Sequence, residues 1–224
     1  MKILWCVTGA GHYLEECAEK LEGLADKEEV TLVFSGAGKE VAVMYGLFDR
    51  MCRCAERIIL EEEQGASSPF VGTLTRKEFD RVVVAPCTAN TVAKIVHGVA
   101  DSLVTNIVAQ AGKAKIPVYL LPTDSVKTQE TVLPIWIDKD KCRSCKSCAA
   151  KKKCKKNAFY FFGRMRIDLS KCVGCRKCIA ACPNDAVSFA KKVLIESRDV
   201  DLGNTEALKR IDGITVAKNT EELV

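Results

Sequence analysis

A run of four cysteines constrains this chain more than any other feature of its sequence. Cys172, Cys175, Cys178 and Cys182 are separated by two, two and three residues, and Pro183 follows the last of them. This spacing is typical of segments that bind a [4Fe-4S] cubane, because closely spaced thiolates can wrap one corner of the cluster. The sequence therefore predicts an iron-sulfur site in this segment.

A second run repeats the first. It has two, two and five residues between its cysteines, which are Cys142, Cys145, Cys148 and Cys154. Residues 137–142 also match residues 167–172 at a period of 30, so a duplicated small module is the economical interpretation. In bacterial ferredoxins with two clusters, the fourth cysteine of each run binds the other cluster. The predicted ligand sets are therefore Cys142, Cys145, Cys148 and Cys182 for one [4Fe-4S] cluster, and Cys154, Cys172, Cys175 and Cys178 for the other. A structural zinc module is the alternative for Cys-x2-Cys pairs, and the Cys-Pro ending disfavours it.

The rest of the chain alternates between short apolar runs and segments with helical spacing. The apolar runs are residues 2–7, 30–34, 81–85 and 115–121. The segments with helical spacing are residues 13–24, 39–48 and 90–99. Buried strands that alternate with helices indicate an α/β fold with a doubly wound, Rossmann-like parallel sheet.

The composition changes abruptly near Trp136, where Cys and Lys become frequent, and it changes back after Ala190. The tail is again of α/β type, with helical spacing at 204–210 and an apolar run at 213–216. We therefore predict an α/β domain formed by residues 1–136 and 191–224. An α+β ferredoxin-type domain with two clusters, residues 137–190, is inserted into it.

Charge and hydropathy exclude several classes of function. The net charge of +5 is modest, and much of the excess is lysine around the first cysteine run. No aromatic residues are interleaved there for base stacking, so we expect no nucleic-acid partner. We interpret the lysines as a solvated face, with docking of an acidic electron donor as the alternative. The apolar opening, residues 1–7, is too short for a signal peptide or a bilayer span. We expect a cytoplasmic protein without membrane contact.

Polar residues follow the predicted strands at their carboxyl ends, where doubly wound sheets bind ligands. Gly9 and Ala10 follow the first strand and Ser35 follows the second. Backbone N–H groups in such turns can hold a phosphate. Four further candidates follow the third strand: Cys87, Thr88, Asn90 and Thr91. Helix capping is the alternative role of the last group, because Thr and Asn are also good N-caps.

At these positions the chain resembles the flavoprotein superfamily that contains flavin-containing cysteine decarboxylases and flavin prenyltransferases. Residues 86–91, Pro-Cys-Thr-Ala-Asn-Thr, resemble its Pro-Ala-Ser-Ala-Asn-Thr signature, and residues 98–103 resemble its Gly-x-x-Asp-x-Leu segment. The resemblance implies FMN, bound at Gly9, Ala10, Ser35, Cys87, Thr88, Asn90 and Thr91. It also implies a homo-oligomer built from trimers, up to a large cage, in which subunits share the flavin.

Two departures from that superfamily speak against decarboxylation. Its catalytic histidine falls near Gly72, and its Pro-x-Met-Asn motif is not visible at residues 122–125. The two histidines of the chain are His12, in the first glycine turn, and His97, in a predicted helix. A histidine in a loop has many uses, so the sequence assigns no catalytic residue.

An α/β FMN domain with an inserted two-cluster ferredoxin looks most like the archaeal dihydromethanopterin reductases (acceptor). That resemblance implies an enzyme fed by a ferredoxin-like donor protein, with electrons passing through two [4Fe-4S] clusters to FMN. It also implies a pterin substrate, dihydromethanopterin, whose C=N bond is reduced to give tetrahydromethanopterin. An electron carrier between proteins, without small-molecule chemistry, is the alternative.

Overall fold

The computed structural model describes residues 1–65 and 67–224. Its central element is a six-stranded sheet with the strand order β12-β5-β4-β1-β2-β3, and all neighbouring strands are parallel. The strands are β1 (Lys2–Val7), β2 (Glu29–Phe34), β3 (Arg57–Leu60), β4 (Arg81–Cys87), β5 (Val118–Pro122) and β12 (Ile214–Val216). The predicted α/β class with a parallel, doubly wound sheet is confirmed.

Helices cover both faces of the sheet because both faces of its strands are apolar. In β1, Ile3 and Trp5 belong to one core, whereas Leu4 and Cys6 belong to the other, and all four are fully buried. The first core includes α1 (Leu14–Leu24), α2 (Gly36–Tyr45) and α3 (Phe48–Cys52). The second includes η1 (Pro69–Val71), α5 (Gly72–Thr75), α6 (Ala89–Val96), α7 (Leu103–Ala114) and α10 (Asp199–Leu208). Two short elements, α4 (Glu61–Gln64) and η3 (Thr220–Glu222), complete this part.

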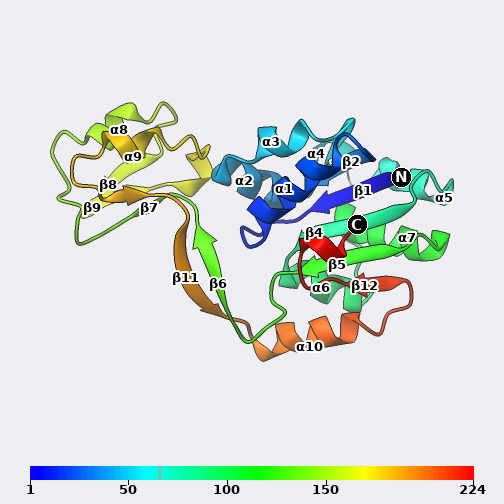
Figure 1. Cartoon of the computed structure of the whole chain (residues 1–224). Coiled ribbons are helices and arrows are strands. Elements are labelled where there is room, and N and C mark those ends of the chain that lie inside the picture. Colours follow the sequence, from blue (N-terminus) through cyan, green and yellow to red (C-terminus); the bar gives the residue numbers. More distant parts are fainter. Residues whose placement is uncertain (66) are drawn as a thin grey trace.

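A two-stranded ribbon leaves the sheet after β5. It consists of β6 (Thr128–Leu133) and β11 (Lys191–Glu196), which are paired antiparallel over their whole length. Figure 1 shows the ribbon, green and orange, with a small module at its far end beside α2. The module contains β7 (Trp136–Ile137), α8 (Ala149–Lys153), β8 (Phe159–Phe162), β9 (Arg164–Ile167), η2 (Leu169–Lys171), α9 (Lys177–Ala181) and β10 (Val187–Ser188).

The module has a core of its own, separate from the two cores of the sheet. Ile135, Phe159, Met165 and Val187 form it, and most of the clustered cysteines pack around them. Its strands pair as β7 with β10 and as β8 with β9, antiparallel in both cases. An isolated ribbon such as β6–β11 is marginally stable, so packing at both ends must hold it in place.

One predicted strand is longer than expected. We placed its end at Ala85, before Pro86, but β4 continues to Cys87. Proline cannot donate a ladder hydrogen bond, and the pairing of β4 with β5 is irregular between Val84 and Cys87, so no donor is required of Pro86 there. Within residues 1–65 and 67–224, no helix is both long enough and apolar enough to cross a membrane.

Candidate functional site

The turns after β1, β2 and β4 meet at the carboxyl edge of the sheet. Thr8 connects two of them, because its N–H and its hydroxyl donate to the carbonyl oxygen of Pro86 at 3.2 and 2.8 Å. Its Oγ1 also accepts from the N–H of Thr88 at 2.9 Å. The turn after β2 packs on the turn after β1, since a Cβ added at Gly9 would lie only 2.6 Å from the Cβ of Ala37. Gly9 therefore lets the backbones of these turns approach each other.

This edge offers hydrogen-bond donors to an anion. In the described ranges 1–65 and 67–224, the N–H groups of Gly9, Ala37 and Asn90 have no hydrogen-bond partner. Ser35 Oγ accepts from the N–H of Gly38 at 3.0 Å, which leaves its own proton free to donate. Free N–H groups and a hydroxyl at helix N-termini are the groups that bind phosphate. The residues present therefore fit the phosphate of a flavin nucleotide.

The turn after β4 gives its predicted residues different roles. Thr88 caps α6, because its Oγ1 accepts from the N–H of Thr91 at 3.2 Å. Thr91 is buried, whereas Asn90 is exposed at the edge. Cys87 is fully buried in the second core, and burial raises the pKa of its thiol, so its side chain cannot face a ligand. The N–H of Ala10 closes its own turn by donating to the carbonyl of Thr8 at 2.8 Å.

Glu61 is a residue of this edge that the sequence did not reveal. Its Oε2 accepts from the N–H of Gly36 at 2.8 Å, and its Oε1 accepts from the N–H of Leu103 at 2.7 Å. One carboxylate thus joins the N-termini of α2 and α7, where negative charge is favourable. No motif marks Glu61, because its partners are backbone groups 25 and 42 residues away.

A cavity of about 440 Å³ adjoins the first glycine turn, between α1 and the ribbon. His12, Glu16, Tyr45 and Phe189 contribute to its lining. Among the described residues, the buried Nε2 of His12 has no hydrogen-bond partner. Burial lowers the pKa of His12, although the nearby carboxylates of Glu16 and Asp124 oppose that change. A buried nitrogen without a partner, beside aromatic and acidic side chains, suits a planar heterocyclic ligand.

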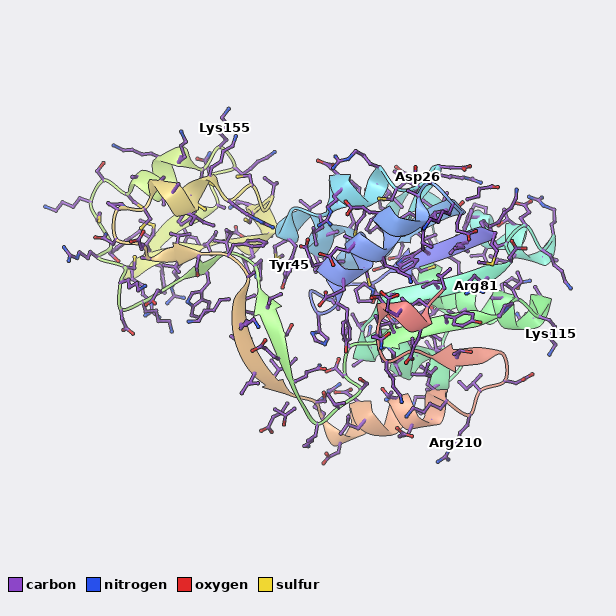
Figure 2. All side chains as sticks on the ribbon, in the orientation of Figure 1. Asp26, Tyr45, Arg81, Lys115, Lys155 and Arg210 are labelled. Atoms are coloured by element: carbon purple, nitrogen blue, oxygen red, sulfur yellow. The ribbon has the colours of Figure 1, made fainter. Side chains whose placement is uncertain are left out.

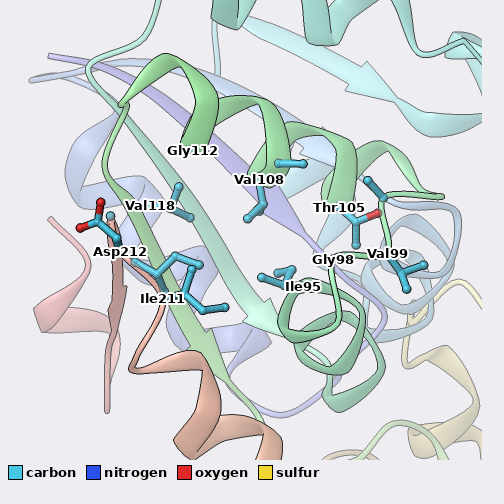
Figure 3. A pocket seen from close by; sticks show the side chains of 13 residues that line it. Ile95, Gly98, Val99, Thr105, Val108, Gly112, Val118, Ile211 and Asp212 are labelled. Carbon is cyan, nitrogen blue, oxygen red and sulfur yellow. The ribbon is translucent and has the colours of Figure 1, made fainter.

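A second cavity, of about 220 Å³, lies away from these turns, between α6, α7 and the segment before β12. Figure 3 shows Ile95, Val108 and Ile211 pointing into it. Apart from Thr105 and Asp212, its lining is apolar or glycine. Binding sites for polar cofactors need several convergent polar groups, so we place the functional site at the carboxyl edge instead.

The clustered cysteines gather in two groups, and each group takes its fourth member from the other run. The first group lines a cavity within the module and consists of Cys142, Cys145, Cys148 and Cys182. The second group surrounds Cys178, whose pKa burial raises to about 11, with smaller contributions from the thiols of Cys172, Cys175 and Cys154. A [4Fe-4S] cubane requires one thiolate for each of its four irons, so both groups fit such a cluster. In residues 1–65 and 67–224, no three His, Cys, Asp or Glu side chains converge as ligands of a single metal ion.

The surface of the module around α8, between Cys148 of the first group and Cys154 of the second, is basic. Lys151, Lys152 and Lys153 lie on α8 and are exposed, and Lys155 and Lys156 follow them. Figure 2 shows Lys155 at the upper edge of the module. Clustered positive charge of this kind attracts an acidic protein surface.

Comparison with known protein families accounts for both parts of the chain. Residues 1–133 match the family described as Flavoprotein, and residues 165–188 match the 4Fe-4S binding domain. A protein from Methanosarcina mazei named dihydromethanopterin reductase (acceptor) is 37% identical over 234 aligned residues, which cover 100% of this chain and 97% of the relative. A protein of the same name from Methanocaldococcus jannaschii is 39% identical, covering 100% and 94%.

A solved structure shows the same arrangement. DmrB from Burkholderia xenovorans in complex with FMN, described as a cubic protein cage for redox transfer, superposes with a TM-score of 0.65. It is 26% identical, and the match covers 99% of this chain and 90% of that one. The similarity therefore includes the sheet domain, the ribbon and the module.

Proposed function

Since the chain belongs to the Flavoprotein family and, within it, to the dihydromethanopterin reductases (acceptor), we propose that it reduces dihydromethanopterin to tetrahydromethanopterin with electrons from a donor protein. The similarity over the full length of these relatives carries this proposal, because it includes both the flavin-type edge and the cysteine module. The geometry supports it, since both parts lie next to the His12 cavity.

We assign the phosphate of FMN to the edge formed by the turns after β1, β2 and β4. The N–H groups of Gly9, Ala37 and Asn90 and the hydroxyls of Ser35 and Thr88 would hold it. Thr91 supports the turn from beneath, and Ala10 and Cys87 take part through their backbone. Bound FMN supplies the ability to accept single electrons and to deliver a hydride.

We assign one [4Fe-4S] cluster to each of the two cysteine groups. The module between residues 137 and 190 would then be the entry for electrons, and the α/β domain of residues 1–136 and 191–224 would hold the flavin. The basic surface of α8 suits an acidic, ferredoxin-like donor protein. The assembly that we propose is a homo-oligomer built from trimers, in keeping with the cage described for DmrB.

The His12 cavity is the place that we assign to the pterin ring. Reduction of a C=N bond adds a hydride to carbon and a proton to nitrogen. His12 Nε2 can satisfy a ring nitrogen there, and its lowered pKa favours the neutral imidazole, which donates or accepts one hydrogen bond at that atom. The aromatic side chains of Tyr45 and Phe189 in the lining offer apolar contact to such a ring.

An electron carrier without a small-molecule substrate is the second candidate. It would need the same cofactors but no cavity beside the flavin edge, and the 440 Å³ space at His12 favours the enzyme. Decarboxylation lacks support, because Gly72, where the resemblance placed the catalytic histidine, has no side chain and begins α5.

An anaerobic experiment on the purified holoprotein tests the proposal. Iron and FMN are quantified, the protein is reduced, and dihydromethanopterin is added while the flavin absorbance is followed. We expect about eight irons and one FMN per chain, and reoxidation by the dihydropterin. Tetrahydromethanopterin is the matched control and should leave the flavin reduced. A flavin that stays reduced with both compounds would leave the electron carrier as the better account.

A further inference from the structure

The module touches the sheet domain through a pair of glycines. Gly46 ends α2, and Gly174 lies between Cys172 and Cys175, with φ of 73° and 59°. A Cβ added at Gly46 would lie 3.0 Å from the carbonyl oxygen of Gly174, and one added at Gly174 would collide with the backbone nitrogen of Gly46. Backbone therefore packs directly on backbone, and no side chain separates α2 from this cysteine loop.

Aromatic side chains pack around the same junction. The hydroxyl of Tyr45 donates to the carbonyl of Val132 in the ribbon at 2.6 Å, and its ring centroid lies 6.2 Å from that of Phe189. The guanidinium carbon of Arg176 lies 3.8 Å from the centroid of Phe189. Figure 2 shows Tyr45 between the module and the sheet domain. Tyr45 also reaches the first glycine turn, since a Cβ at Gly11 would collide with its hydroxyl.

Cys172 lies against the same helix. A cavity of about 360 Å³ is lined by Cys172 and Ser170 from the module, and by Gly36, Lys39 and Val43 along α2. Gly36 follows Ser35 in the turn that we assign to the flavin phosphate. With 10 residues, α2 is about 15 Å long. It therefore extends from the flavin edge to the second cysteine run.

The other cysteine group lies within the module. All residues that line its cavity fall between Cys142 and Asn184, and two of them, Ala149 and Ala150, belong to α8. The next residues of α8 are the exposed lysines of the basic surface. No residue of the sheet domain lines the first group, whereas Cys172 and Gly174 of the second run lie against α2 and Gly46.

We propose that these positions set the order of electron transfer within one subunit. Electrons from the one-electron donor protein enter at the site of Cys142, Cys145, Cys148 and Cys182. They leave for the flavin from the site of Cys154, Cys172, Cys175 and Cys178, across the Gly46–Gly174 junction. Each transfer moves one electron without making or breaking a bond, and two transfers with one proton from solvent supply a hydride equivalent. The order rests on the proposed function for its donor and cofactors, and not on the identity of the final substrate.

A matched pair of variants tests the order. Cys145 and Cys175 are the second cysteines of their runs, and both are exposed. The holoproteins Cys145→Ser and Cys175→Ser are mixed with reduced bacterial two-cluster ferredoxin and frozen at set times. EPR then shows whether the surviving cluster is reduced, and absorbance shows the state of the flavin. No pterin is present, so failure here is distinct from failure of the reductase proposal.

The two variants have opposite expected results. In Cys175→Ser the reduced surviving cluster should accumulate while the flavin stays oxidised. In Cys145→Ser no reduced cluster should accumulate, and the rapid reduction of the flavin by the donor protein, expected in the wild type, should be lost. The reverse pattern, or wild-type flavin reduction in either variant, would overturn the order.

A second pair of variants keeps every cysteine. Gly46→Asn adds a side chain at the junction, and Asn tolerates the left-handed conformation. Gly98→Asn is the control, because Gly98 has a φ of 70° and a Cβ there would meet nothing within 4 Å. We expect Gly46→Asn to speed amide hydrogen exchange in residues 169–176 and to lose the rapid reduction of the flavin by the donor protein. The EPR signals of the clusters should be retained. Gly98→Asn should match the wild type, and a wild-type rate of flavin reduction in Gly46→Asn would overturn the route.

Discussion

Replacement of Glu61 by Gln is expected to destabilise the fold by about 2 kcal/mol. A hydrogen bond to a charged group contributes about 1.5–3 kcal/mol, and Glu61 accepts two, at 2.8 and 2.7 Å, from the N-termini of α2 and α7. The amide of Gln retains one acceptor oxygen, but its NH₂ group then faces the other N–H. Because Glu61 is only half-buried, we place the loss at the lower end of the range.

The same substitution should tighten FMN binding, because it removes a negative charge from the first turn of α2, beside the turn assigned to the phosphate. Chemical unfolding of the holoprotein, followed by circular dichroism at fixed protein concentration, measures the first effect, and fluorescence titration of the apoprotein with FMN measures the second. Glu63→Gln is the control, since Glu63 lies exposed on the same short helix and should change stability by less than about 0.5 kcal/mol. Equal midpoints for the two variants would refute the bridging role of Glu61. Unchanged or weaker FMN binding in Glu61→Gln would refute the phosphate position.

Two further variants test other residues of the site. The folded state lowers the pKa of His12 from 6.5, so the folded chain binds fewer protons and loses stability as the pH falls below about 6.5. His12→Gln should therefore reduce the shift in unfolding midpoint between about pH 7 and pH 5, and an unchanged shift would contradict this account. Thr88→Ala should cost about 1 kcal/mol through the lost cap of α6 and weaken FMN binding, whereas Thr88→Ser should restore both; undiminished FMN binding in Thr88→Ala would remove Thr88 from the phosphate site.

The elements that the sequence predicted well are those marked by a pattern of neighbouring residues. The strand at residues 2–7 has the predicted bounds, because its apolar run ends at a glycine turn. The helix after it begins at Leu14, one residue from the predicted start. The cysteine runs carry their chemistry in their spacing, and the cross-run grouping follows from a duplicated module.

Elements without local signals were missed. The edge strand β3 (Arg57–Leu60) has only four residues, and Arg57 and Ile58 are exposed, so it lacks the apolar run of a buried strand. The ribbon β6–β11 is also largely exposed, with Leu194 at 74%. Even its innermost pair, Leu133 with Lys191, is separated by 57 residues of sequence. Glu61 and the Gly46–Gly174 junction depend on contacts between distant segments, which no single-sequence pattern encodes.

The point of insertion explains why the module lies beside the flavin edge. In a parallel sheet all strands end at the same edge, so the turns after β1, β2 and β4 meet there. The module is inserted after β5, the neighbour of β4, and the chain therefore leaves the sheet at that edge. The ribbon then carries the second cysteine run to the end of α2, where glycine on both sides allows backbone contact. An insertion after any helix would emerge at the opposite edge, so the position of the module in the sequence is itself part of the electron route that we propose.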